Sequence, residues 1–189
     1  VYVTGGALGA TPINERIFAK LPELLGHACV IHQTGSRQHN GDFTRANELR
    51  AQLSPDLQRR YAVREFVTTE LPGVFALADL IVARSGAGTV AELAHIGKPS
   101  ILIPLAHAGG NEQERNATIL TAAGGAVMIP EASASPDRLY QEIVQLLDRP
   151  DQLAEMSAGA RSISTENAAA GLATLVMRHA RSSWAHSAD

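Results

Sequence analysis

Two glycine-rich segments are the parts of this 189-residue chain best suited to hold a phosphate. Residues 5–10 (Gly-Gly-Ala-Leu-Gly-Ala) and 84–89 (Arg-Ser-Gly-Ala-Gly-Thr) each follow a short apolar run and precede a helical pattern. Glycine lets the backbone approach a ligand closely, and the first N–H groups of a helix have no internal partner. The sequence contains no P-loop string, and its glycine spacing differs from the dinucleotide-binding fingerprint. The alternative is that each loop is only a tight turn that packs a helix onto a sheet.

Glu92 is the acidic residue nearest to the second glycine-rich segment. Residues 89–92 match a capping box, in which Glu92 would bind the backbone N–H of Thr89. The functional alternative places Glu92 one turn above the loop, where its carboxylate accepts hydrogen bonds from the two hydroxyls of a ribose. Such charge-assisted bonds are worth about 1.5 to 3 kcal/mol each. The sequence leaves both roles open.

A polar group follows the fifth apolar run. Gln113 and Asn116 are three residues apart, and Glu112 and Asn116 are four apart, so these side chains share one face of a helix start. Amide and carboxylate groups in this position suit the hydroxyls of a sugar. Asn111 as N-cap with Glu114 in the first turn is the structural alternative for the same segment.

The composition excludes several classes of protein. A net charge of −3, from 16 Lys and Arg against 19 Asp and Glu, argues against a basic surface for nucleic acid and against a disordered chain. No run reaches the roughly 18 apolar residues of a membrane span, and no signal peptide is present, so a cytosolic protein is predicted. The single cysteine, Cys29, lies in an apolar run and is predicted to be a small buried side chain. His107 is the one histidine near the predicted site, and the others lack metal-ligand spacing, so neither a metal nor another cofactor is predicted.

Six short apolar runs alternate with helical patterns along the chain. This alternation predicts a parallel sheet covered by helices on both faces. Right-handed crossovers then give a doubly wound, Rossmann-like α/β sheet of order 3-2-1-4-5-6. Strands are predicted at residues 1–3, 28–33, 61–66, 79–83, 100–105 and 126–130. Helices are predicted at residues 12–24, 42–53, 71–77, 89–96, 111–123 and 136–147, with two more after residue 151.

This strand order predicts where a ligand binds. In open α/β sheets, ligands lie beyond the carboxyl ends of the strands, at the switch point between the first and the fourth strand. The segments that follow these two strands are residues 5–10 and 84–89, the most glycine-rich loops of the chain. The sequence therefore predicts a ligand between the two glycine-rich loops.

The residues that form these features resemble the carboxyl-terminal half of the MurG family of bacterial N-acetylglucosaminyltransferases. The matching strings are residues 3–10 followed by Asn14, then residues 84–93, then Gln113 and Asn116. The resemblance runs from residue 1 to about residue 181. It implies that residues 1–181 are the UDP-GlcNAc-binding domain of a two-domain GT-B glycosyltransferase, and residues 182–189 are expected to be a frayed tail.

The resemblance also implies which residues contact each part of the donor. The diphosphate is expected at Gly88 and Thr89, and the ribose at Glu92. The sugar is expected at Gln113 and Asn116. The full set of expected substrate-binding residues, in which Phe66 and Val67 meet the uracil through their backbone, is Gly6, Ala7, Asn14, Phe66, Val67, Arg84, Ser85, Gly86, Ala87, Gly88, Thr89, Glu92, His107, Glu112, Gln113 and Asn116.

Two positions depart from the usual pattern of the family. Ala7 stands where serine is common, so a hydroxyl that would reach the diphosphate is absent. Glu112 stands in place of the first residue of a frequent Gln-Gln pair, next to a loop one residue longer than usual.

The activity implied by the resemblance is transfer of N-acetylglucosamine from UDP-GlcNAc to lipid I, which gives lipid II for peptidoglycan synthesis, with inversion at the anomeric carbon. Because the chain opens within a strand pattern, it is expected to be a fragment, inactive alone. The domain that binds the lipid-linked muramyl-pentapeptide, with the catalytic base and a peripheral contact to the cytoplasmic face of the bacterial membrane, is expected in an amino-terminal half absent from this chain. The alternatives are another GT-B UDP-sugar transferase such as a lipid galactosyltransferase, a UDP-GlcNAc 2-epimerase, and a non-catalytic nucleotide-sugar-binding subunit.

Overall fold

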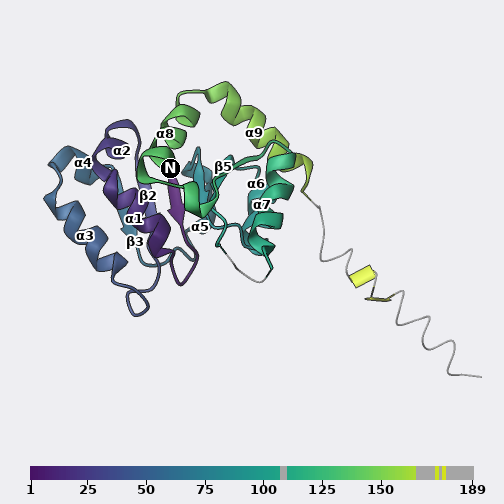
Figure 1. The fold of residues 1–189 in the computed structure, drawn as a ribbon, viewed down its shortest axis with the longest axis horizontal. Helices are drawn as coiled ribbons and strands as arrows, with labels where there is room; N and C mark the ends of the chain where they lie inside the picture. Colours follow the sequence, from purple (N-terminus) through teal and green to yellow (C-terminus); the bar gives the residue numbers. More distant parts are fainter. Residues whose placement is uncertain (107–109, 165–172, 175, 178–189) are drawn as a thin grey trace, which may run out of the picture.

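The computed structural model is a six-stranded parallel sheet with helices on both faces (Figure 1). It describes residues 1–106, 110–164, 173, 174, 176 and 177. The strand order is β3-β2-β1-β4-β5-β6, which confirms the predicted doubly wound order. The strands are β1 (Tyr2–Thr4), β2 (Val30–Gln33), β3 (Tyr61–Arg64), β4 (Ile81–Ala83), β5 (Ser100–Leu102) and β6 (Ala126–Met128).

Successive residues of the central strands point to opposite faces of the sheet and build two separate cores. Val3, Val82 and Ile101 belong to one core, whereas Tyr2 and Ile81 belong to the other. Because both faces are buried, the strands read as continuous apolar runs instead of alternating patterns. This is why the sequence located all six strands, although most of them are shorter than the apolar run that contains them.

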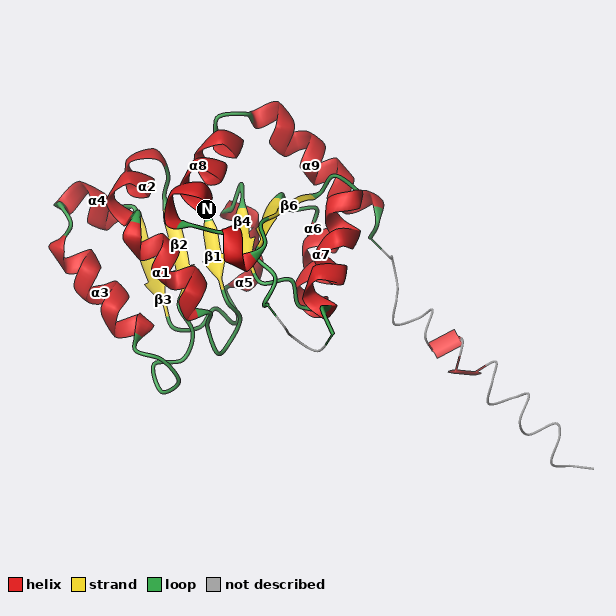
Figure 2. Ribbon diagram, in the orientation of Figure 1, coloured by secondary structure: helices red, strands yellow, loops and turns green. Residues whose placement is uncertain are grey.

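The helices form a layer on each face of the sheet (Figure 2). The helices that pack on the first core are α1 (Thr11–Ala19), α2 (Leu21–His27), α3 (Asp42–Gln52) and α8 (Pro136–Leu147). Those on the second core are α5 (Leu71–Leu77), α6 (Ala87–Ile96) and α7 (Glu112–Ala122). The last helix, α9 (Pro150–Ser162), gives Met156 to the first core and Ala160 to the second. Two short pieces complete the described chain: α4 (Pro55–Arg59) and the 3₁₀ helix η1 (Glu131–Ser133).

Several details of the prediction are wrong. The single helix predicted over residues 12–24 is two helices, because Pro22 cannot continue the preceding turns and the chain breaks at Lys20. Cys29 is exposed, so its prediction as a buried side chain fails. Helix α6 begins at Ala87, ahead of the predicted start at residue 89, and α4 was not predicted at all.

Other predictions fall outside the described residues. These are the frayed tail over residues 182–189 and most of the second helix after residue 151. Within the part of the chain that is described, no helix combines the length and the apolar character needed to cross a membrane.

The two central strands determine where the glycine-rich loops lie. β1 and β4 pair in parallel, with Thr4 opposite Ala83 at their carboxyl ends. From there the chain leaves β1 toward α1 on one face and leaves β4 toward α6 on the other. The loops over residues 5–10 and 84–86 therefore lie beside one another at the same edge of the sheet, as the strand order predicts.

Candidate functional site

A cleft of about 770 Å³ opens at the carboxyl ends of β1 and β4. It is lined by the loop after β1, the segment after β3, the β4–α6 connection and the start of α7. The structure thus brings together segments that are far apart in the sequence. The sequence-predicted binding residues that line the cleft are Gly6, Ala7, Phe66, Val67, Arg84, Gly86, Thr89, Glu92 and Gln113.

The first glycine loop, residues 5–10, turns tightly after β1. The backbone N–H of Gly9 donates to the carbonyl of Gly6 at 3.1 Å, and both glycines have a φ of 80°. Glycine adopts this left-handed conformation without the steric cost that a side chain brings. In the part of the chain that the structure describes, the amides of Ala7 and Leu8 have no hydrogen-bond acceptor, and both residues line the cleft. The loop therefore offers backbone donors for an anionic ligand.

Helix α6 starts directly at the second glycine loop. Its N-cap is Gly86, and Thr89 is already the third helical residue, so the structure excludes the capping box between Thr89 and Glu92, which was the alternative role for Glu92. The side chain of Glu92 is exposed, lines the cleft and has no hydrogen-bond partner among the described residues. The first amides of α6 lack intrahelical partners, as they do at any helix start. The cleft therefore combines backbone donors with one carboxylate that is free to accept.

Gln33, at the end of β2, joins three segments around the cleft and was not predicted. Its Nε2 donates to the carbonyl of Gly6 at 3.0 Å, while its Oε1 accepts from the Tyr2 hydroxyl at 2.9 Å and from the Val67 amide at 3.1 Å. Burial raises the pKa of Tyr2, and the charge of Glu92 adds to this effect, so the phenol stays a neutral donor. The sequence offered one indication of this role, which is the position of Gln33 at the end of the strand that pairs with β1.

The segment after β3 brings an aromatic ring to the cleft. Phe66 is 43% exposed and lines the cleft, so part of this residue is open to a ligand. The backbone amide of Val67, in contrast, is already bound to Gln33. At this segment the ring of Phe66, and not the Val67 amide, remains available for contact.

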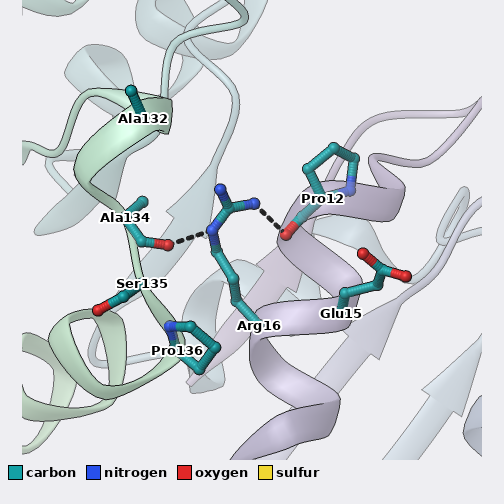
Figure 3. Close-up of a pocket in the computed structure, with 7 residues that line it drawn as sticks. All are labelled: Pro12, Glu15, Arg16, Ala132, Ala134, Ser135 and Pro136. Atoms are coloured by element: carbon teal, nitrogen blue, oxygen red, sulfur yellow. Dashed lines mark hydrogen bonds between the residues drawn. The ribbon is translucent and has the colours of Figure 1, made fainter.

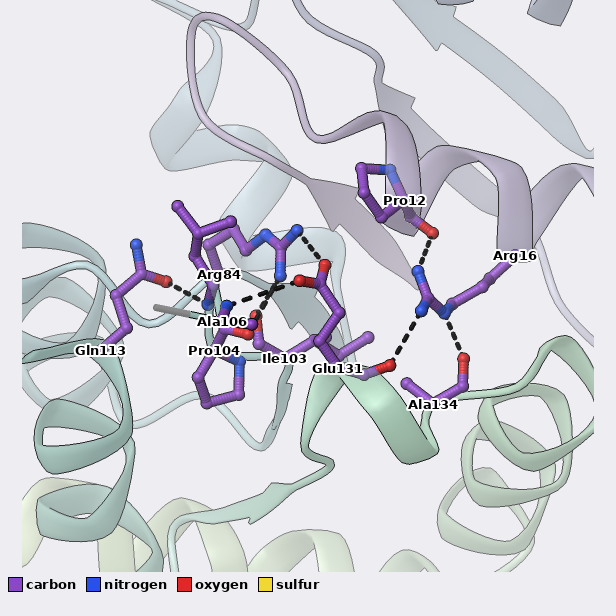
Figure 4. Close-up of polar contacts among 10 residues, drawn as sticks. Pro12, Arg16, Arg84, Ile103, Pro104, Ala106, Gln113, Glu131 and Ala134 are labelled. Carbon is purple, nitrogen blue, oxygen red and sulfur yellow. Dashed lines mark hydrogen bonds and ion pairs between the residues drawn. The ribbon is translucent and has the colours of Figure 1, made fainter. Parts of the chain in front are cut away.

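Arg84 lines the cleft, but its guanidinium is bound within the protein (Figure 4). It donates to the carbonyls of Ile103 and Pro104, both at 3.1 Å, and forms an ion pair with Glu131. The second Glu131 oxygen accepts from the amide of Ala106 at 3.4 Å. The side chains of Arg84 and Glu131 are only 11% and 17% exposed. Arg84 thus supports the loop after β5, and no spacing rule in the sequence could have paired it with Glu131.

Three of the predicted residues tie the start of α7 to the second glycine loop. The Ser85 hydroxyl donates to the Gln113 carbonyl at 2.7 Å, and Asn116 Nδ2 donates to the Ser85 carbonyl at 3.1 Å. The side-chain oxygen of Gln113 accepts from the Leu105 amide at 2.9 Å, which leaves its Nε2 without a partner in the described part of the chain. Gln113 reaches the cleft, whereas Asn116 and the exposed Glu112 do not line it.

A second pocket, of about 400 Å³, lies between α1 and the start of α8 (Figure 3). Arg16 crosses it, and its guanidinium donates to the carbonyls of Pro12, Ala134 and Glu131. Each of its three nitrogens is therefore used, and Figure 4 shows that these contacts connect α1 with the residues of η1 and beyond. Arg16 therefore has a structural role in this pocket, because each nitrogen of its guanidinium is bound to a backbone carbonyl of the protein.

The remaining predicted residues lie away from the cleft. Asn14 is fully buried behind the first glycine loop, and Ala87 and Gly88 are exposed in the first turn of α6 without lining the cleft. His107 lies outside the described residues. Asn111 occupies the N-cap position of α7 but makes no capping hydrogen bond. Among the residues with described placement, no three His, Cys, Asp or Glu side chains form a group that could hold a metal ion.

Comparison with known proteins places the chain among glycosyltransferases. Residues 1–174 match the glycosyltransferase family 28 C-terminal domain. Two similar curated proteins share the name UDP-N-acetylglucosamine--N-acetylmuramyl-(pentapeptide) pyrophosphoryl-undecaprenol N-acetylglucosamine transferase. The protein of Rhodopseudomonas palustris is 40% identical over 185 residues, which cover 96% of this chain and 48% of the relative. That of Corynebacterium efficiens is 38% identical over 177 residues, which cover 93% and 45%.

A solved structure agrees with these relatives. The crystal structure of Acinetobacter baumannii MurG matches 94% of this chain and 51% of its own, with a TM-score of 0.75 and 29% sequence identity. The chain thus spans about half the length of the relatives that it matches.

Proposed function

Because the chain belongs to glycosyltransferase family 28, we propose that residues 1–181 form the donor-binding domain of an inverting N-acetylglucosaminyltransferase that uses UDP-GlcNAc. The names of its relatives describe transfer to an N-acetylmuramyl-pentapeptide on pyrophosphoryl-undecaprenol. The proposed reaction is the same transfer, which makes lipid II from lipid I in peptidoglycan synthesis. An acceptor with an undecaprenol tail would bring the enzyme to the cytoplasmic face of the membrane.

In this proposal the nucleotide lies in the cleft between the two glycine loops. The diphosphate takes the amides of Ala7 and Leu8 and that of Thr89 in the first turn of α6, where the partial positive charge of the helix start favours an anion. The uracil packs against the exposed ring of Phe66. The ribose hydroxyls bond to Glu92, and the hexose lies near the unpaired Nε2 of Gln113.

The chemical role of this domain follows from the bond that breaks. As the acceptor oxygen attacks the anomeric carbon, negative charge develops on the departing UDP. Backbone donors already in place around the diphosphate stabilise this charge without further reorganisation. The deprotonation of the acceptor is assigned to groups outside this domain.

The single observation that carries the proposal is the free carboxylate of Glu92 beside the second glycine loop. A capping role would have explained this residue without any ligand, and its place in the second turn of α6 excludes that role. A carboxylate that accepts on both oxygens suits a ribose diol, whereas a cleft for an anion alone has no use for a negative charge.

Calorimetry with UDP, UDP-GlcNAc and NAD tests the proposal. The expected result is binding of UDP and UDP-GlcNAc, with no preference for NAD and no turnover of lipid I by this chain alone. A preference for NAD would contradict the proposal.

The Glu92→Gln variant tests the ribose contact. Loss of a charge-assisted bond of about 1.5 to 3 kcal/mol weakens UDP binding by roughly tenfold to more than a hundredfold. The matched control is Glu114→Gln, because Glu114 is exposed on α7 and does not line the cleft. Equal UDP affinity in the Glu92 variant and its control would remove the ribose assignment.

A further inference from the structure

A chain of buried hydrogen bonds runs behind the first glycine loop and reaches no ligand itself. The Tyr61 hydroxyl lies 2.9 Å from His32 Nδ1, and His32 Nε2 lies 2.9 Å from Asn14 Oδ1. Asn14 Nδ2 then donates to Asp42 Oδ2 at 2.8 Å and to the carbonyl of Thr34 at 3.0 Å. Asn14, His32 and Thr34 are fully buried.

The partners determine the direction of every bond in this chain. Asn14 Nδ2 faces a carbonyl and a carboxylate, which can only accept, so the amide orientation is fixed and Oδ1 must accept from His32. His32 therefore carries its proton on Nε2, and its bare Nδ1 accepts from the Tyr61 hydroxyl. Burial lowers the pKa of His32 to about 3, which agrees with a neutral ring. The network is satisfied in one arrangement only.

The Asp42 end of this chain is connected to the first glycine loop. Asp42 Oδ2 accepts from the hydroxyl of Thr11, the residue that follows the loop, at 2.7 Å. The Asp42 amide donates to Asn40 Oδ1 at 3.0 Å, and Asn40 Nδ2 donates to the carbonyl of Leu8 at 3.1 Å. The amide of Ser36 donates to the carbonyl of Ala7 at 3.1 Å. A trans peptide places the C=O of one residue opposite the N–H of the next. The bond from Ser36 to the Ala7 carbonyl therefore orients the Leu8 amide, and the bonds from Gly9 and Gln33 to the Gly6 carbonyl orient the Ala7 amide. The bond from Asn40 holds the Leu8 carbonyl, at the end of the same turn.

The loop also lies directly on the backbone of residues 34–36. A Cβ at Gly9 would meet the Thr34 carbonyl and come within 2.8 Å of Asn40 Nδ2, and a Cβ at Gly35 would meet the backbone of Gly9. Both glycines also have positive φ, of 80° and 89°. No side chain fits between the two segments. A shift of residues 34–36 would therefore move the glycine loop as well.

From these contacts we infer that Asn14, His32, Asn40 and Asp42 are positioning residues that hold the Ala7 and Leu8 amides in place for the diphosphate of the nucleotide-sugar. This inference rests on the proposed function for the identity of the ligand. A glycine-rich loop has more conformational freedom to lose on binding than any other segment. Fixing it before the ligand arrives removes that cost from the binding step. The four residues act through the loop and do not touch the ligand.

Asn40→Ala is the sharpest test, because Asn40 lies outside the cleft and connects the network to the Leu8 carbonyl. The expected result is faster hydrogen exchange at the Ala7 and Leu8 amides and a threefold to tenfold loss of UDP affinity, with the melting temperature nearly unchanged. The matched control is Asn47→Ala on α3, the helix that begins two residues after Asn40. Asn47 also donates one side-chain bond, to the Phe43 carbonyl at 2.8 Å, but has no contact with the loop. This control should keep the exchange rates and the affinity of the unmodified chain.

A pair of variants at Asp42 separates positioning from general stability. Asp42→Ala removes the acceptor for Thr11 and Asn14, whereas Asp42→Asn keeps an oxygen that can accept from both. The expected result is that Asn restores UDP affinity to within about threefold of the unmodified chain and Ala does not. If Asp42→Ala fails to fold, the Asn40 and Asn47 comparison decides alone.

The outcomes distinguish this inference from the function on which it rests. If the unmodified chain fails to bind UDP, the proposed function falls, and the exchange rates of Ala7 and Leu8 still decide whether the network fixes the loop. If the unmodified chain binds UDP and Asn40→Ala binds it equally well with unchanged exchange, the positioning role is overturned and the proposed function stands.

Discussion

The first glycine loop and the loop after β5, which both line the cleft, are supported in physically different ways. Behind the first glycine loop, the support is a chain of hydrogen bonds through Asn14 and His32, both fully buried. Behind the loop after β5, the support is the Arg84 and Glu131 ion pair, whose side chains are 11% and 17% exposed. One half of the site is thus held by a buried network of neutral side chains that ends in the Asp42 carboxylate, and the other by a partly buried ion pair.

This difference predicts that the two supports fail under different conditions. Salt does not weaken the contacts of a neutral, buried histidine, because the ring carries no charge to be screened. Acid does act on it, because a protonated ring in that position would lose its hydration, and the folded state therefore disfavours protonation. The partly buried pair of Arg84 and Glu131 depends on the presence of both charges, and removing one of them leaves the other unpaired. Acid therefore tests the first half, and removal of a charge tests the second.

The largest expected effect is the loss of stability in acid through His32. Its pKa is lowered from 6.5 to about 3 by burial, while the nearby charge of Asp42 acts in the opposite direction. The ring faces Tyr61, Asn14 and, at 5.5 Å between centroids, Phe18. The unfolded chain binds the proton below pH 6.5 and the folded chain does not. Stability is therefore complete above pH 6.5 and falls by about 1.4 kcal/mol for each pH unit below it, until the pH approaches 3.

Urea unfolding of the unmodified chain and of His32→Gln, at pH 7 and pH 5, measures this effect. The variant should lose less stability between the two pH values than the unmodified chain, by about 2 kcal/mol. His39→Gln is the control, because His39 is exposed in the segment after β2. Should His32→Gln not fold, an NMR titration of the unmodified chain replaces it. A His32 ring that takes up a proton between pH 7 and pH 5 would contradict the prediction.

An effect of similar size is expected when the ion pair is broken. Glu131→Gln keeps the size of the side chain but removes the charge that faces Arg84, so a loss of about 1 to 3 kcal/mol in unfolding free energy is expected. The control is Glu15→Gln, whose partner Arg45 lies 3.5 Å away with both side chains more than half exposed. An exposed pair of this kind contributes about 0 to 1 kcal/mol. Equal losses in the two variants would show that burial of the Arg84 pair has no energetic consequence.

The sequence predicted the strand order and the position of the cleft because both depend on local patterns. Continuous apolar runs identify strands that are buried on both faces, and parallel strands of this order bring the loops after β1 and β4 together. Glycine at positions 6 and 9 is a local requirement of the turn, since both have positive φ. These features are readable from a few consecutive residues.

The supports behind the loops could not be read in this way. His32 and Asn14 lie on different elements, and Arg84 and Glu131 are 47 positions apart, so only the folded chain brings each pair together. Asn14 was predicted to contact the substrate because of its place in a motif, but the structure puts it behind the loop. The capping box at Thr89 failed for a related reason, since a change of two residues in the helix start alters the role of Glu92.

The smallest expected effect is a change in affinity for UDP-GlcNAc, which shows whether Gln113 or Asn116 binds the hexose. Gln113 lines the cleft with a free Nε2, whereas Asn116 Nδ2 is bound to the Ser85 carbonyl and lies outside the lining. Gln113→Ala should therefore weaken UDP-GlcNAc by about twofold to tenfold, the value of one neutral hydrogen bond, and leave UDP unchanged. Asn116→Ala should instead weaken both ligands alike, because it loosens the second glycine loop that holds the diphosphate. Measuring the ratio of the two affinities on one preparation cancels differences in the folded fraction. If both variants change that ratio equally, Asn116 also reaches the hexose, and the distinction drawn from its bond to Ser85 is wrong.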